Sequence, residues 1–196
     1  MTTIWALLSQ LGDSRLLLPS ASALIAIELW RGNIWARRWA LAVGIVGLAV
    51  LSSKLAFLGW GVGISRLNFT GFSGHAAMSA LVWPVVLWLL MGCSAPGRWG
   101  ALFGLLLAVS IAYSRLPLNF HSLSEVIGGF VLGAAGSMAA LSGGAPSRPL
   151  QGKWVATALL LGACVPAVIP QVHTHQMVVA AAKAISGRTT VFDRSM

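Results

Sequence analysis

Charged residues are scarce in this chain, and acidic residues are the scarcest of them. Only 9% of the 196 residues are charged, with four Asp and Glu against thirteen Lys and Arg. An ordinary soluble domain carries charge on about 25% of its residues, because a small fold exposes much of its surface to water. With 57% of its residues hydrophobic, the chain cannot form an ordinary soluble fold. It is expected to lie in lipid.

Cysteine is also scarce, and no recognisable signal peptide is present. Cys93 and Cys164 have no CxxC neighbour, so we interpret both as small buried hydrophobic residues rather than as a disulfide framework. Residues 1–13 lack a basic stretch and a small-residue cleavage site. We therefore expect the first membrane span to serve as its own insertion signal.

The net charge of +9 raises the question of an anionic partner. Nucleic-acid binding usually requires a clustered basic face, whereas the basic residues here are scattered between apolar runs. The pattern excludes nucleic acid as the expected partner. It favours the membrane bilayer itself, with basic residues that anchor loops and hold a phosphate.

Six apolar stretches approach the length of about 20 residues that a transmembrane helix needs. They predict an all-α polytopic bundle of about six transmembrane helices, near residues 16–30, 39–59, 75–91, 99–113, 123–141 and 155–169. Within the fifth stretch, Gly128, Gly129, Gly133 and Gly136 predict close packing of helix backbones.

The two ends of the chain flank this bundle. We divide the sequence into an N-terminal interfacial segment (1–15), a transmembrane catalytic core (16–170) and a C-terminal tail (171–196). The tail has a possible amphipathic helix near residues 175–185 that suits the membrane surface. His173 and His175 lie in the tail, but two histidines without further ligands are a weak metal signal.

Basic residues in the loops predict the orientation of the chain. The loops 31–38, 94–98 and 142–153 carry Arg and Lys and alternate onto one side, which the positive-inside rule makes cytoplasmic. The other side then holds residues 54–73 and 114–122 and both termini.

Ionisable residues gather on that second side, at the ends of the predicted spans. Lys54 lies near the end of the second span, His75 begins the third, Arg115 ends the fourth, and His121 and Glu125 begin the fifth. Because these spans alternate in direction, all five residues are expected at one level. Such residues are costly in a membrane protein and usually functional.

These residue types suit a phosphate. Ser73 and Gly74 precede a predicted helix, whose first backbone N–H groups are free to bind an anion. Arg115 can hold two oxygens at once, and Lys54 adds a point charge. The pattern predicts a phosphate-sized pocket.

The two histidines suit phosphoryl transfer. His121 and Glu125 are four residues apart, which places them on one helix face. The carboxylate can hold one ring nitrogen protonated and leave the other free to attack. His75, from another helix, could act as the general acid.

Three motifs resemble the signatures of the type 2 phosphatidic acid phosphatases. The third signature, Ser-Arg-x5-His-x3-Asp, is similar to Ser114-Arg115-x5-His121-x3-Glu125. The second, Pro-Ser-Gly-His, is similar to Phe72-Ser73-Gly74-His75, and Lys54 matches the lysine that opens the first, Lys-x6-Arg-Pro. The motifs cover residues 54–125.

This resemblance implies a role for each site residue. His121 would be the nucleophile that forms a phosphohistidine, Glu125 would orient it, and His75 would protonate the leaving group and then activate water. The phosphate oxygens would be bound by Lys54, Ser73, Gly74 and Arg115. The family's chemistry implies no metal and no other cofactor.

The chain departs from the family pattern at three places. Glu125 stands where Asp is usual, Phe72 replaces Pro, and Gly61-Val62 stand where the first signature has Arg-Pro. Arg66 could supply the missing charge from the same loop. The departures keep open a catalytically weak or inactive relative that binds lipid phosphate, and a transporter is a further alternative.

The resulting expectation is a lipid phosphatase of the bacterial inner membrane with its site facing the periplasm. Candidate substrates are a polyprenyl pyrophosphate, phosphatidic acid, phosphatidylglycerol phosphate and lipid A. The sequence does not fix the head group or the oligomeric state.

Overall fold

The structure is a computed structural model that describes residues 2–92, 95–142, 150–168 and 174–193. The described chain is helical, with a single isolated β-bridge between Ile64 and Phe69. Its elements are α1 (Thr2–Gln10), α2 (Ser14–Trp30), α3 (Trp35–Trp60), η1 (Ser65–Leu67), α4 (Gly74–Met91), α5 (Ala95–Ser114), α6 (Leu123–Leu141), α7 (Gly152–Val168) and α8 (Thr174–Ser186). The predicted all-α class is confirmed.

Fewer helices than the six predicted are long and apolar enough to cross a membrane. Among the described residues, four meet this requirement by length and composition, namely α3, α4, the Gly97–Ser114 part of α5, and α6. The apolar helix α7 is shorter, with 17 residues, and α2 has the same length. Both fall short of about 20 residues, and α2 also carries the charged residues Arg15 and Glu28. The helices form where the sequence predicts them, but the number of full spans is nearer four or five.

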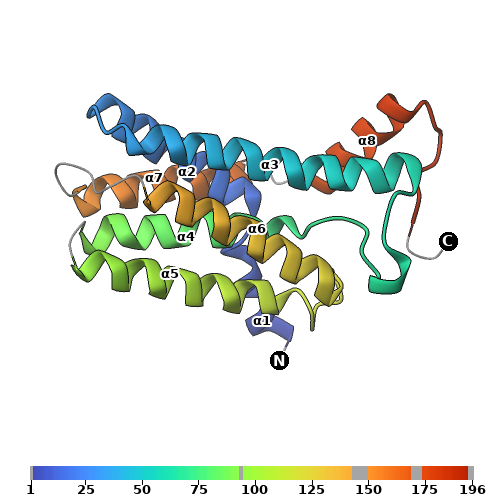
Figure 1. Ribbon diagram of the computed structural model, residues 1–196, viewed down its shortest axis with the longest axis horizontal. Helices are drawn as coiled ribbons and strands as arrows, with labels where there is room; N and C mark the ends of the chain where they lie inside the picture. The colour runs from blue at the N-terminus through green and yellow to red at the C-terminus, as the bar shows by residue number, and fades with distance from the viewer. Residues whose placement is uncertain (1, 93–94, 143–149, 169–173, 194–196) are drawn as a thin grey trace.

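Helix α4 is the centre of the bundle. Figure 1 shows α3, α4, α5 and α6 running side by side along the long axis, with α2 and α7 beside them. Thirteen residues of α4 are buried, among them Leu81, Val82, Val85 and Val86. By contrast, α3 exposes Leu41, Ile45 and other large apolar side chains. A helix that is apolar all round and buried is a core helix, whereas α3 turns large apolar side chains outward, as a helix in contact with lipid does.

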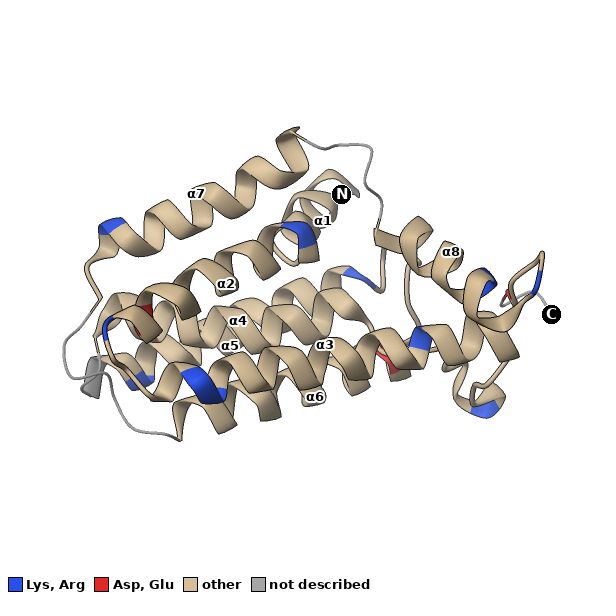
Figure 2. Cartoon of the chain, turned by 90° about the horizontal axis from the view of Figure 1, so that it is seen from above, with Lys and Arg blue, Asp and Glu red and all other residues tan. Residues whose placement is uncertain are grey.

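Charge is confined to a few places on this bundle. Figure 2 shows the helices uncharged along most of their length, with the Lys, Arg, Asp and Glu residues lying mainly toward their ends. This distribution agrees with the cost of an ionised side chain in the hydrocarbon core. This charge pattern, together with the four long apolar helices among the described residues, indicates a membrane protein.

Glycines in α6 bring that helix against α4, as predicted. A Cβ at Gly129 would lie 2.5 Å from the carbonyl oxygen of Ser73, a separation that no side chain tolerates. One turn further, Gly133 packs against the backbone of Ala77. The absence of a side chain at these positions therefore sets how closely the starts of α4 and α6 approach.

Both ends of the chain pack against this helical core. In α1, the Trp5 ring contacts the Tyr113 ring of α5 edge-on, with centroids 5.5 Å apart. The predicted tail helix is present as α8 and packs on the end of α3, where a Cβ at Gly59 would lie 3.3 Å from Cβ of Ser186. After α8, the Phe192 N–H donates to the Leu58 carbonyl at 3.0 Å. His175 is exposed on α8, and His173 lies outside the described residues.

Candidate active site

The predicted site residues lie together at one end of the bundle. The end of α3 contributes Lys54, the start of α4 contributes Ser73, Gly74 and His75, and the α5–α6 connection contributes Arg115 and His121. Contacts join these elements directly, since the Ser73 N–H donates to the Glu125 carbonyl at 3.1 Å. The antiparallel course of α3 to α6 produces this convergence (Figure 1).

His121 and Glu125 form a hydrogen-bonded pair. Nδ1 of His121 lies 2.7 Å from Oε2 of Glu125, whose side chain is fully buried. With an ionised carboxylate, Nδ1 donates the hydrogen bond and Nε2 keeps its lone pair. The longer side chain of Glu125, in place of the Asp usual in the family, therefore still reaches the histidine.

The start of α6 fixes the backbone around this pair. Ser122 caps the helix by accepting from the Glu125 N–H at 3.4 Å, and Oε2 of Glu125 accepts from the Ser122 N–H at 3.2 Å. This reciprocal arrangement is a capping box. Glu125 therefore both caps α6 and contacts His121, so the two roles are compatible.

Thr70 is a member of the site that the sequence analysis did not identify. Its backbone N–H donates to Oε1 of Glu125 at 2.8 Å, and its hydroxyl makes a short hydrogen bond to the same oxygen. Thr70 and Glu125 are 55 residues apart in sequence, so spacing could not reveal the contact. Both carboxylate oxygens of Glu125 are thus hydrogen-bonded, Oε1 to Thr70 and Oε2 to His121 and Ser122.

The N-terminus of α4 presents free backbone donors. The Ser73 hydroxyl accepts from the Ala76 N–H at 3.5 Å, which makes Ser73 the N-cap. The N–H groups of Gly74 and His75 have no acceptor in the part of the chain that the structure describes. Unpaired N–H groups at a helix start form an anion site.

Arg115 is buried and has unused hydrogen-bonding capacity. Its side chain is 8% exposed, its Nη1 donates to the Ser9 hydroxyl, and its guanidinium lies 4.4 Å from the centre of the Phe120 ring. Nε has no partner among the described residues. Burial lowers the pKa of Arg115 to about 10, although the charge of Asp13 opposes this shift. The guanidinium remains positive at neutral pH and lacks a carboxylate partner in the described chain.

His121 stays neutral more readily than a histidine in water. Burial lowers the pKa of His121, while its hydrogen bond to Glu125 raises it and the charges of Lys54 and Arg115 lower it further. Lys54 has no hydrogen bond or ion pair with any described residue. The charges of these two cations therefore favour the uncharged form of the imidazole, which is the nucleophilic form.

The turn between α1 and α2 covers His75, which the sequence analysis did not foresee. A Cβ at Gly12 would lie 3.4 Å from Cδ2 of His75, and the Leu11 carbonyl accepts from the Trp83 indole at 3.0 Å. Asp13 follows, and its charge acts on His75. Burial alone would raise the pKa of Asp13, but hydrogen bonds from Arg15 lower it below the ordinary value.

No arginine of the α3–α4 loop takes the place of the arginine that the first signature lacks here. Gly61 ends α3 in the left-handed conformation, with φ 71°. Arg66 lies in η1, exposed, and makes no hydrogen bond or ion pair with another described residue. The structure therefore gives Arg66 no contact with the residues around His121.

Within the described residues, no three His, Cys, Asp or Glu side chains group closely enough to hold a metal ion. The ionisable groups around His121 comprise two cations, a second histidine and one carboxylate. Such a positively charged and partly buried set is complementary to an anion.

Comparison with known proteins supports the family resemblance over part of the chain. The model of the PAP2 superfamily matches residues 67–144, which include every predicted site residue except Lys54. A protein of Klebsiella pneumoniae, described as an uncharacterized 22.5 kDa protein in the cps region, is 50% identical over 137 residues. The match covers 68% of this chain and 66% of that protein. No solved structure matches the chain. Residues 67–144 thus match the PAP2 superfamily, in agreement with the signature resemblance, and the chain spans just under two thirds of the length of the relative it matches.

Proposed function

We propose that this protein is an integral membrane phosphatase that removes phosphate from a lipid phosphomonoester or pyrophosphate through a phosphohistidine on His121. The supporting observation is the hydrogen-bonded His121–Glu125 pair, on which the charges of Arg115 and Lys54 act; neither cation has an ion pair among the described residues. A histidine with one nitrogen held by a carboxylate and the other free is an activated nucleophile. The cations supply the charge stabilisation that phosphoryl transfer requires.

The phosphate would bind at the start of α4. The N–H groups of Gly74 and His75, the Ser73 hydroxyl, Arg115 and Lys54 offer donors on several sides of one anion. These donors come from three separate helices and their ends, so they fix the phosphate relative to His121.

The first chemical step transfers the phosphoryl group to the enzyme. Nε2 of His121 attacks phosphorus, and the bond between phosphorus and the leaving oxygen breaks. His75 gives its proton to that oxygen, so the product is a lipid alcohol, or a lipid monophosphate when the substrate is a pyrophosphate. Positioned proton transfer of this kind contributes about 10²–10⁴-fold to a rate.

The second step restores the enzyme. Water attacks phosphorus as the bond to Nε2 breaks, and His75, now neutral, takes the proton from that water. Inorganic phosphate leaves, with His121 neutral and His75 protonated again. In both steps Glu125 stabilises the imidazole of His121, and Thr70 holds Glu125 in place.

The substrate would come from the membrane. Its phosphate would sit at the helix ends while its tail remains in the bilayer, and candidates are a polyprenyl pyrophosphate, phosphatidic acid, phosphatidylglycerol phosphate and lipid A. The loop charges support a site that faces the periplasm from a bacterial inner membrane. The ionisable site residues lie at one end of the helices, which disfavours a transporter because an ion path needs polar groups through the membrane's depth.

Phosphate release from this lipid panel by the detergent-purified protein tests the proposal. We expect His121→Ala to abolish release and His75→Ala to reduce it by roughly 10²–10⁴-fold. His175→Ala is the matched control, since His175 is exposed on α8, and it should retain full activity. Each assay is repeated with a chelator, which should have no effect.

Two outcomes would overturn the proposal in different ways. If the folded wild-type protein binds lipid phosphate but releases nothing from any member of the panel, it is an inactive binding relative. Its missing first-signature arginine at Gly61 is the sequence feature that would explain this result. If the chelator stops phosphate release, the metal-free mechanism is wrong.

A further inference from the structure

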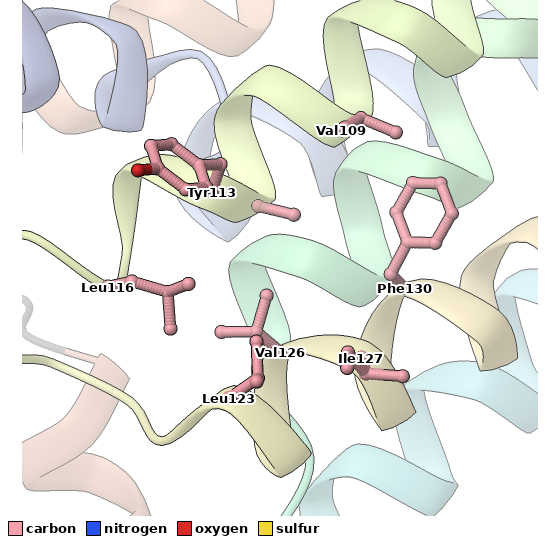
Figure 3. Close-up of a pocket in the computed structure, with 8 residues that line it drawn as sticks. Val109, Tyr113, Leu116, Leu123, Val126, Ile127 and Phe130 are labelled. Carbon is pink, nitrogen blue, oxygen red and sulfur yellow. The ribbon is translucent and has the colours of Figure 1, made fainter.

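An apolar groove lies between α5 and α6. It has a volume of about 200 Å³, and its lining consists of Val109, Ala112, Tyr113, Leu116, Leu123, Val126, Ile127 and Phe130. Figure 3 shows the labelled aliphatic side chains and the Phe130 ring around one space between the two helices. The surface of the groove is apolar and open on one side.

The groove adjoins the residues of the proposed phosphate site. Leu116 directly follows Arg115, and Val126 directly follows Glu125. Leu123 is the first residue of α6, two residues after His121. The groove lining therefore lies on the same two chain segments as Arg115, His121 and Glu125.

The lining determines which part of a substrate could occupy the groove. It carries no charge that could bind a phosphate, and it suits a hydrocarbon chain. Arg115 and Lys54, by contrast, carry the positive charge that a phosphate needs. Ligand pockets for whole small molecules have volumes of about 300–1,000 Å³. At about 200 Å³, this groove suits only the part of a tail nearest its phosphate.

We propose that the α5–α6 groove binds the first part of the hydrocarbon tail of a lipid phosphate whose phosphate lies at Arg115 and His121. This inference rests on the proposed function and adds the path of the tail. The remainder of the tail extends from the open side of the groove into the bilayer.

The groove contributes to catalysis by orienting the substrate. A tail gains little transfer free energy on leaving lipid for an apolar groove, because lipid is equally apolar. Fixing the tail beside Leu116 and Leu123 instead holds the phosphorus in line with Nε2 of His121, and a small misplacement of reacting atoms can cost about 10²-fold in rate. Long tails therefore raise kcat/KM.

The test compares alkyl phosphates of increasing chain length, which share one phosphate group, in detergent micelles. Val109→Trp and Ile127→Trp each fill the groove with an indole ring. Val131→Trp is the matched control, since Val131 lies on α6, is 59% exposed and does not line the groove. The shortest member, methyl phosphate, has no tail that could enter the groove, so this short substrate reports the phosphate site alone.

We expect the wild type and Val131→Trp to hydrolyse the long-chain substrate more efficiently than the short one. The two groove variants should keep short-chain activity and lose roughly tenfold or more of kcat/KM on the long chain. If all three Trp variants have the same kcat/KM on the long-chain substrate, the groove does not bind the tail. If the groove variants instead lose a dimer on size-exclusion chromatography, a second copy occupies the groove and the proposal is wrong. Wild type that hydrolyses neither substrate refutes the proposed function itself, and this inference with it.

Discussion

Glu125 divides its two carboxylate oxygens between the nucleophile and the loop that precedes α4. One oxygen contacts His121 and the Ser122 N–H, and the other accepts two hydrogen bonds from Thr70. A buried carboxylate needs such partners, because an unpaired charge away from water is costly. The residue thus ties α6, His121 and the α3–α4 loop into one unit.

Glu125→Gln tests this arrangement. The amide keeps the size of the side chain, but it no longer favours the tautomer of His121 that leaves Nε2 free. We expect kcat to fall by about 10²–10⁴-fold with little change in KM. Steady-state kinetics on the best lipid substrate measure both constants, and unchanged kcat would show that Glu125 only caps α6.

The pH dependence of kcat/KM reports on His121. Burial lowers the pKa of His121 below its ordinary value of 6.5, and protonation of its free nitrogen removes the nucleophile. Activity should therefore fall as the pH falls, with a midpoint below 6.5. If the fall of kcat/KM toward low pH instead has its midpoint above 6.5, the burial of His121 in the working enzyme is contradicted.

Ser9 extends the site to the N-terminal segment. Its hydroxyl accepts a hydrogen bond from Arg115, a residue 106 positions away. Ser9→Ala leaves Nη1 without this acceptor and frees the guanidinium to move. We expect KM for the lipid substrate to rise several-fold while kcat changes less, and Ser52→Ala, exposed on α3, is the control. Equal kinetics in both variants would show that Ser9 does not position Arg115.

Among the elements, the contact between α4 and α6 does most to shape the site. The two helix starts carry Ser73, Gly74 and His75 on one side and Glu125 on the other, and Gly129 allows them to approach. Any side chain at residue 129 would push against the backbone of Ser73.

Gly129→Val is expected to separate these helix starts. Overpacking of this kind costs about 1–3 kcal/mol of stability, and the shift also moves Glu125 and His121 away from the start of α4. Thermal unfolding should show a lowered Tm together with loss of phosphatase activity. Gly44→Val on α3 is the control, because nothing lies within 4 Å of a Cβ there. Equal effects of the two substitutions would contradict the account.

The sequence predicted the helices well because apolar length and periodicity are local properties. Residues 123–141 were predicted as a span and form α6, and residues 75–91 fall within α4. The number of full spans was overestimated, because α2 and α7 are short helices of 17 residues. Counting apolar residues does not distinguish a short helix from a complete crossing.

The convergence of the site was predictable, but its supporting contacts were not. Lys54, His75, Arg115 and His121 sit at helix ends, so alternating helix direction was enough to bring them to one level. Ser9 and Thr70 join the site through contacts that depend on tertiary packing. Neither belongs to a recognisable motif, so no local signal identified them.

The whole molecule presents its ionisable site residues at one end of the bundle, together with α1 and the α3–α4 loop. The start of α3, with Arg37 and Arg38, and the start of α7, with Lys153, lie toward the opposite end (Figure 1). The account therefore predicts that the site end faces away from the cytoplasm.

Cysteine labelling of intact cells tests this orientation. In a chain with Cys93 and Cys164 replaced by alanine, Ser65→Cys in the exposed loop at the site end should react with a membrane-impermeant maleimide from outside. Gln151→Cys at the opposite end, also exposed, should react only after permeabilisation. The reverse pattern would invert the orientation and move the site to the cytoplasmic face.

The central claim is a covalent phosphate on His121, and trapping that intermediate tests it most directly. Purified protein is mixed briefly with phosphate-labelled lipid substrate, quenched in alkali and mapped by mass spectrometry. The account predicts an acid-labile, alkali-stable phosphate on His121 that is absent in His121→Ala and present in His175→Ala. Turnover of the lipid by a His121→Ala protein, or a phosphoenzyme on another residue, would contradict it.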